Sequence, residues 1–181
     1  AAAGGSTLPP GNPTLDNLVT SLHNYGNPLI PIHVQSFLET LFSLSVNIKY
    51  DPAYDAAAVK LNVQQRLRES YSFSARTFGQ GVSADEIAAF IQGVPGVIAC
   101  NATGLAAGPT SKAGDLSSTA WSVSAYQKWL SQQVTLERPA SGSPTRICAY
   151  LPAANPDVLP SAAEILVLDP DPKKVVLGVL P

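Results

Sequence analysis

A two-residue alternation of side-chain type over residues 38–50 constrains the fold of this chain more than any other feature. The even positions are apolar or aromatic except for Thr40, and the odd positions are polar except for Leu41. Because strand side chains point alternately to opposite faces, this pattern predicts a strand with one buried and one solvated face. A strand of this length extends about 43 Å, so we expect a bend or a bulge in it, and residues 29–36 are predicted to form its preceding partner strand.

Outside residues 106–144, three helices are predicted, at residues 14–25, from Asp55 to about Ser70, and after Ser83. Each has apolar residues recurring at helical spacing, and the second buries a stripe led by Val59 and Val63. Each also has boundary signals, because Thr, Asp and Ser side chains cap helix N-termini and glycine suits the left-handed position after a C-terminus. The predicted boundary residues are Thr14, Asp55 and Ser83 at the starts, and Gly26 and Gly93 at the ends.

Further strands are predicted at 97–105, 145–151, 164–170 and 175–181, with a turn at Asp169-Pro170-Asp171-Pro172 between the last two. This element order predicts an α+β fold: a two-layer sandwich with helices packed on one face of a mainly antiparallel mixed sheet. We expect a flexible N-terminal segment at 1–13 and one domain over 14–181, with a loop and helix inserted at about 106–144.

The segment Gly79-x-Gly81-x-x-Ala84 matches the glycine pattern of a dinucleotide-binding turn. Such a site needs a buried strand before the first glycine and an acidic residue about twenty positions later. The preceding SYSFSARTF alternates in polarity, the following VIACNATGL holds no acid, and Asp85 and Glu86 at the helix start would repel a pyrophosphate. The glycines therefore predict a tight chain reversal ahead of a capped helix, and no cofactor is expected.

Residues suited to catalysis or metal binding are few and scattered. The chain has His23, His33, Cys100 and Cys148, and neither a nucleophile elbow nor a clustered ligand motif. We therefore predict no catalytic residue and no metal site, and we expect the two cysteines to be buried free thiols, with a disulfide between neighbouring strands as the alternative. A small hydrolase that pairs His33 with Cys100 or Cys148 is an alternative function.

The amino-acid composition and net charge of the chain limit the classes of partner that it is expected to bind. Charged residues make up 13% of the chain, the net charge is −2, and no run of Lys or Arg occurs, so electrostatic capture of nucleic acid is not expected. No apolar run is long enough to cross a bilayer, so no membrane insertion is expected. The low charge favours a component of an assembly over a free monomer. The absence of Met, even at position 1, indicates a processed chain or a piece of a longer one, and we favour the piece.

Several segments, taken in order, resemble one family. These are VNIKYDPAYD at a strand end, the helix AAAVKLNVQQRLRE, the turn FGQGVSADEI, IQGVPGV leading into a strand, and the ending AEILVLDPDPKKVVLGVLP. Over about 27–105 and 145–181 the chain is similar to the C-terminal region of baseplate J-like proteins, which are wedge components of contractile phage tails and phage-tail-like injection particles. The likeness depends on order and spacing, because no single motif in it is catalytic.

The resemblance implies a structural role without an active site. It implies contacts with other baseplate wedge subunits and with the proteins that initiate sheath and tube, in a virion or tail-like particle assembled in the bacterial cytoplasm. Two departures limit it: the family's longer N-terminal part is missing here, and residues 106–144 have no counterpart. The candidate contact residues, chosen as exposed apolar, arginine or aromatic side chains, are Leu61, Arg66, Arg68, Arg76, Trp121, Tyr126 and Trp129. A ligand-binding module that uses the Trp-containing insertion is a further alternative.

Overall fold

The computed structural model describes residues 36–107, 145–149 and 162–181, together with 11–27 and the single positions 5, 7, 8, 30, 32 and 34. Over these residues the chain folds into three α-helices and a mixed sheet, which confirms the predicted α+β class. The elements in chain order are α1 Pro13–Tyr25, β1 Leu38–Tyr50, α2 Ala56–Ser70, η2 Phe73–Ala75, β2 Val82–Ser83, α3 Ala84–Gln92, β3 Val97–Ala107, β4 Arg146–Ile147, β5 Glu164–Leu168, η3 Pro172–Lys174 and β6 Val175–Val179.

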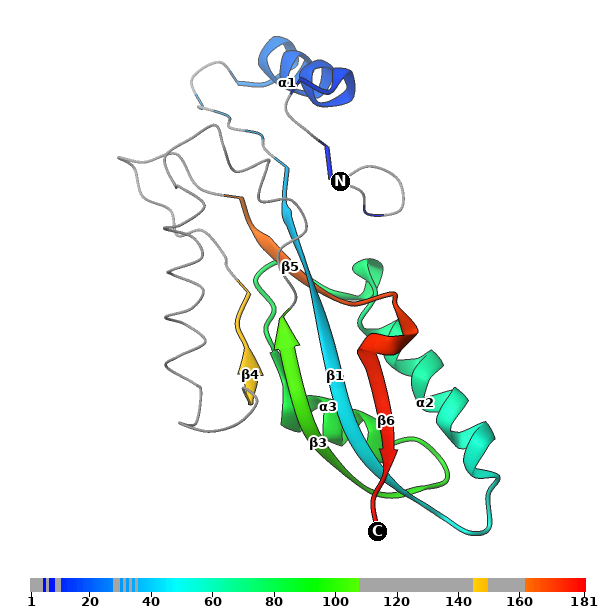
Figure 1. The fold of residues 1–181 in the computed structure, drawn as a ribbon. Helices are drawn as coiled ribbons and strands as arrows, with labels where there is room; N and C mark the ends of the chain where they lie inside the picture. Colours follow the sequence, from blue (N-terminus) through cyan, green and yellow to red (C-terminus); the bar gives the residue numbers. More distant parts are fainter. Residues whose placement is uncertain are drawn as a thin grey trace.

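Strand β1 is the centre of the sheet and has the bounds that the alternation predicted (Figure 1). Strand β3 pairs antiparallel along it, with Phe42 opposite Ala107 and Tyr50 opposite Val97. The register shifts twice, between Ser45 and Val46 and again next to Tyr50, so the expected irregularity is present. Such bulges increase the local twist and let a long strand curve around the helices behind it.

The closing strands β5 and β6 both run parallel to β1, on the side away from β3. Strand β5 lies beside Leu38–Phe42 and β6 beside Leu44–Ile48, so the two follow one another along the same edge with η3 between them. The sheet is therefore mixed as predicted: the β1–β3 pair is antiparallel, and the β1–β5 and β1–β6 pairs are parallel. The local sequence of a strand indicates which face is buried and does not indicate the direction of its partner, so the parallel direction of β5 and β6 was not specified by the prediction.

Helices α2 and α3 cover the same face of the sheet (Figure 1). The even positions of β1 from Leu38 to Ile48 are all buried, and the apolar ones from Phe42 onward pack against the stripe Val59, Val63 and Leu67 of α2 and against Ile87 and Ile91 of α3. Each such side chain contributes about 1.5–3 kcal/mol when it leaves water. Helices α2 and α3 therefore bury their apolar stripes in one shared core.

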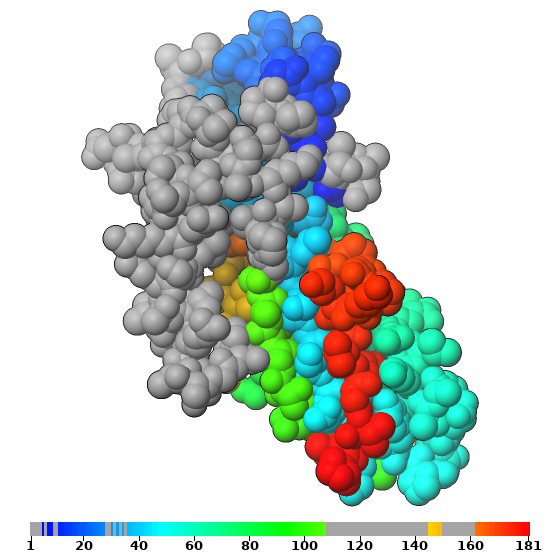
Figure 2. All heavy atoms as spheres, viewed as in Figure 1, coloured from blue at the N-terminus to red at the C-terminus, as the bar shows by residue number. Residues whose placement is uncertain are grey.

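The opposite face of the sheet divides into two parts. Near the start of β1, Phe37, Ile165 and Val167 form a second, smaller apolar cluster, against which Leu41 and Phe73 pack. Farther along, β1 presents partly exposed polar side chains, and Figure 2 shows β3, β1 and β6 as adjacent bands on this face. The strand is thus solvated on its odd face only over its second half.

Several boundary predictions require correction. Helix α1 is capped by Asn12, whose side chain accepts from the Thr14 N–H, so Thr14 lies inside the first turn, after Pro13. Gly93 ends α3 in a right-handed conformation, with φ −73°, and the left-handed residue of that loop is Gly96 at φ 88°. Asp55 and Ser83 cap α2 and α3 as predicted, and Gly26 ends α1 as predicted, although in an extended and not a left-handed conformation, with φ −83°.

The N-terminal part and the insertion differ from expectation where the structure describes them. Within 29–36, the described positions 30, 32, 34 and 36 belong to no strand, so the partner strand predicted there is not found at them. The N–H of Leu8 donates to Ser36 Oγ at 2.9 Å, which ties part of the segment predicted as flexible to the start of β1. Strand β3 continues through Ala107, and residues 108–144, most of the predicted insertion, lie outside the described residues.

Candidate functional site

The glycine-rich turn before α3 is held by backbone contacts within the chain. Gly79 has φ 75°, which favours glycine, and its N–H donates to the carbonyl of Glu164 at 2.8 Å. At Gly81 an added Cβ would lie 2.8 Å from the carbonyl oxygen of Ile147, so glycine there permits the close approach of β4. Gly79 therefore has the role that the sequence predicted, a chain reversal, whereas the close backbone contact at Gly81 was not predicted.

Arg76 fills the centre of this turn. Its guanidinium donates to the carbonyls of Gln80 at 3.0 Å and Gly81 at 2.6 Å, and lies over the ring of Tyr71 at 5.2 Å from the centroid. Its side chain is only 3% exposed, and a weaker ion pair joins it to Glu86 at 3.4 Å. The prediction of Arg76 as a partner contact was wrong, because the aromatic residue that it stacks on is inside this chain.

Tyr71 connects this turn to both helices. Its ring meets Phe42 of β1 and Phe90 of α3 edge to face, with centroids 5.5 and 6.2 Å apart, and its hydroxyl donates to Glu86 at 3.3 Å. Burial, reinforced by the Glu86 carboxylate, raises the pKa of the Tyr71 phenol well above its ordinary value, so it stays neutral. Tyr71 therefore serves as a hydrogen-bond donor to Glu86, and its ring packs against the ring of Phe90.

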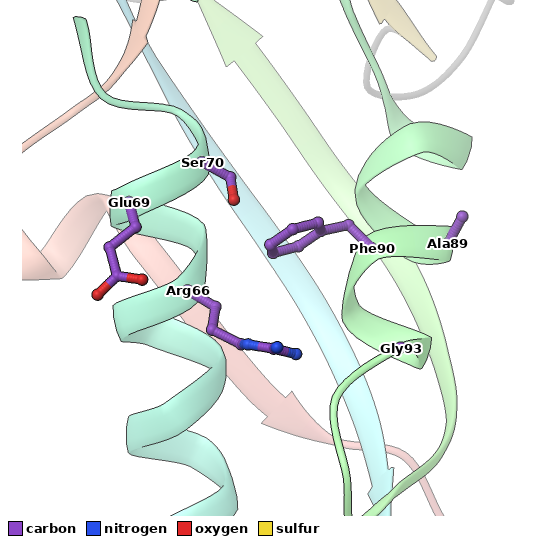
Figure 3. A pocket seen from close by; sticks show the side chains of 6 residues that line it. All are labelled: Arg66, Glu69, Ser70, Ala89, Phe90 and Gly93. Atoms are coloured by element: carbon purple, nitrogen blue, oxygen red, sulfur yellow. The ribbon is translucent and has the colours of Figure 1, made fainter. Parts of the chain in front are cut away.

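An open groove of about 470 Å³ lies between α2 and α3 on the side away from the sheet (Figure 3). Helices α2 and α3 form its walls, and both bury residues in the core that they share with β1. Its lining residues are Arg66, Glu69 and Ser70 of α2 and Ala89, Phe90 and Gly93 at the end of α3. Three of the six lining residues are polar or charged, so the groove is an open surface feature with polar groups on the α2 side and an aromatic ring on the α3 side.

The polar side chains that reach into this groove are donors. Arg66 and Ser70 lie one turn apart on α2, and Figure 3 shows both pointing into the space in front of Phe90. Within the described part of the chain, neither side chain makes a hydrogen bond or an ion pair. The carboxylate of Glu69 points away from the groove and accepts from Gln65 at 2.9 Å. The groove thus offers a cation and a hydroxyl beside an aromatic ring.

The other predicted contact residues lie elsewhere. Leu61 is 67% exposed, and Arg68, two turns later on the same stripe of α2, donates to the carbonyl of Pro170 at 3.0 Å. This stripe faces away from Arg66, so the structure does not bring the three α2 contacts together. Trp121, Tyr126 and Trp129 lie outside the described residues, and the proposed ligand-binding insertion stays a prediction.

Cys100 and Cys148 do not form a disulfide, as favoured from the sequence, and both are partly exposed rather than fully buried. Cys100 donates its S–H to the carbonyl of Ala88 at 3.2 Å, and burial raises the pKa of its thiol. Since the thiolate is the nucleophile, a raised pKa makes Cys100 a poor one at neutral pH. His33, its suggested partner, lies outside the described residues, so the predicted Cys/His pairing stays a prediction.

The buried polar side chains of the described residues are bonded internally. They are Thr40, Arg76 and Glu164, and the hydroxyl of Thr40 donates to the carboxylate of Glu164 between β1 and β5. Within the same ranges, no three His, Cys, Asp or Glu side chains gather as metal ligands. No helix in the part of the chain with assigned structure has both the length and the apolar character to span a bilayer.

Sequence reasoning missed Ser70 and Phe90 as groove residues. The spacing of Arg66 and Ser70 places them on one helix stripe, which a helical projection shows from sequence alone. No local signal places Phe90 opposite them, because that juxtaposition depends on how α3 docks on the sheet. Compared with models of protein families, with curated proteins and with solved structures, the chain matches none.

Proposed function

We propose that this chain is a structural subunit of a contractile tail-like baseplate, corresponding to the C-terminal domain of a wedge protein. It acts through protein–protein contacts with neighbouring wedge subunits and with sheath- and tube-initiating proteins. The particle is a virion or an injection device assembled in the bacterial cytoplasm. The resemblance in the order and spacing of segments over 27–105 and 145–181 supports this proposal.

One structural observation carries it: within the described residues, the buried polar side chains bond to other parts of this chain, and Arg66 stays at the surface without a side-chain partner. Arg76, Glu164 and Cys100 each bond to another part of this chain, whereas Arg66 lines an open groove. A catalytic site places its reactive groups toward a substrate. Here the accessible chemistry is that of recognition.

The mechanism is mechanical. The core shared by β1, α2 and α3 makes one rigid body, so a neighbour bound to one helix is held in fixed relation to the sheet. Low charge, at 13% of the residues, reduces the desolvation cost of burying the surface against other subunits. Such a domain acts by holding its neighbours in fixed positions, and this role does not require a chemical step.

The test is to purify the full-length parent under native conditions, unaltered and as Cys100→Ser. The proposal predicts that both forms sediment with a particle far heavier than the parent. The hydrolase alternative predicts a free parent that cleaves activated esters and loses this activity on Cys100→Ser. Recovery of the parent in the light fractions alone, under gentle lysis, contradicts the proposal.

A further inference from the structure

We infer that the groove between α2 and α3 is the docking site for an acidic segment of a partner protein, in which an Asp or Glu side chain lies next to an apolar one. This inference rests on the proposed function and names the chemistry of one of its contacts. The carboxylate accepts from Arg66 and Ser70, and the neighbouring apolar side chain covers Phe90.

The charge and hydrogen-bonding pattern of the groove selects this occupant. Arg66 and Ser70 can both donate and have no partner in the described residues, and the carboxylate of Glu69, the acidic residue among those that line the groove, is turned away and accepts from Gln65. An occupant that supplies a second donor would leave the Arg66 guanidinium desolvated without an acceptor, which is costly. An anionic acceptor satisfies both donors at once, as in charge-assisted pairing.

The floor of the groove argues for a protein segment over a simple anion. Phe90 offers an aromatic surface that is held from behind by the Tyr71 ring. Bare phosphate gains nothing from this surface, whereas a side chain beside an Asp or Glu buries apolar area there. Arginine and aromatic residues together are also the usual high-energy contacts of protein interfaces.

The site is prepared before binding. Arg66 extends from α2 toward the last turn of α3, where the negative end of the helix dipole favours a cation. The groove walls come from two helices fixed in one core, so little conformational entropy is lost on docking. The exposed ion pair itself contributes a modest part of the affinity, so we expect removal of the charge to weaken binding about five-fold.

The experiment titrates the isotope-labelled chain with a capped Gly-Asp-Phe-Gly peptide and follows its amide and guanidinium resonances. The inference predicts shifts at Arg66, Ser70 and Gly93, and about five-fold weaker binding of the Gly-Asn-Phe-Gly peptide. Arg66→Glu should abolish the shifts. The matched control, Lys60→Glu, makes the same charge change at an exposed position of α2 outside the groove and should leave them unchanged.

Other results overturn the inference. Equal binding of the Asp and Asn peptides, or binding unaffected by Arg66→Glu, shows that charge does not select the occupant. An equal response to inorganic phosphate shows a general anion site, and groove shifts that follow the chain's own dilution show that a second copy is the occupant. The titration uses the chain alone, so a negative result there does not affect the sedimentation test of the baseplate proposal. A negative sedimentation result likewise does not affect the titration of the groove.

Discussion

We expect the hydrogen bonds from Arg76 to two backbone carbonyls to stabilise the connection between α2 and α3 more than its ion pair with Glu86 does. Arg76→Met keeps most of the side-chain length and removes the donors to Gln80 and Gly81. A hydrogen bond from a charged donor contributes about 1.5–3 kcal/mol net, so losing two costs about 3–6 kcal/mol. Removal of the buried Arg76 Nε, which has no acceptor among the described residues, returns about 1 kcal/mol. The net loss is about 2–5 kcal/mol.

The ion pair is expected to contribute much less. The Glu86 side chain is 44% exposed and its oxygen lies 3.4 Å from the Arg76 nitrogen. Exposed pairs of this kind are worth about 0–1 kcal/mol, so Glu86→Gln should cost less than about 1 kcal/mol. The backbone cap from Ser83 Oγ to the Glu86 N–H is kept in this variant.

Urea unfolding of the chain, followed by far-ultraviolet circular dichroism, measures both variants and the double variant. We expect the Arg76→Met midpoint to fall far more than the Glu86→Gln midpoint, and the coupling energy of the pair to stay below about 1 kcal/mol. If Glu86→Gln lowers the free energy of unfolding as much as Arg76→Met does, then the ion pair stabilises the turn and the proposed role of the two carbonyl hydrogen bonds is refuted.

Three further predictions test other local contacts. Gly81→Ala should destabilise the chain by about 1–3 kcal/mol through overpacking, because its Cβ would lie 2.8 Å from the Ile147 carbonyl oxygen; an unchanged urea midpoint would show that β4 is free to move away. Asp55→Ala should cost about 1 kcal/mol by removing the cap of α2, and thermal unfolding without a lower midpoint would contradict the observed cap. In a Cys148→Ser background, iodoacetamide should modify Cys100 with a pH midpoint above the 9.0 of an ordinary thiol, and unfolding in urea should restore that ordinary value. Because the folded thiol holds its proton more tightly than the unfolded one, the stability contributed by Cys100 is complete below pH 9.0 and falls as the pH rises above it; identical midpoints in folded and unfolded chains would contradict this.

The parts of the fold that local chemistry determines were predictable from sequence. The alternation over β1 fixed its bounds and its buried face, and the side chains of Asp55 and Ser83 fixed the starts of α2 and α3. Asn12 was missed because Thr14 is an equally good cap by type, and only the geometry of the first turn distinguishes them.

The parts that depend on distant segments were not predictable in this way. The parallel alignment of β5 and β6 along one edge of β1 is a long-range pairing that their own residues do not encode. Arg76 was assigned to the surface because arginine beside aromatics is common at interfaces, and the same chemistry here stacks it on Tyr71 in the interior. Arg66 was identified as a contact residue, but its groove exists only where α3 docks beside α2.

The central claim is that this domain acts as a fixed part of a multi-subunit particle. The most direct measurement is electron microscopy of material recovered through a tag on the full-length parent, with the tag marked by a bound antibody fragment. The account predicts contractile tail-like particles with the label at the baseplate end. Recovery of the labelled parent only as isolated molecules, or labels spread along the length of a tube, would contradict it.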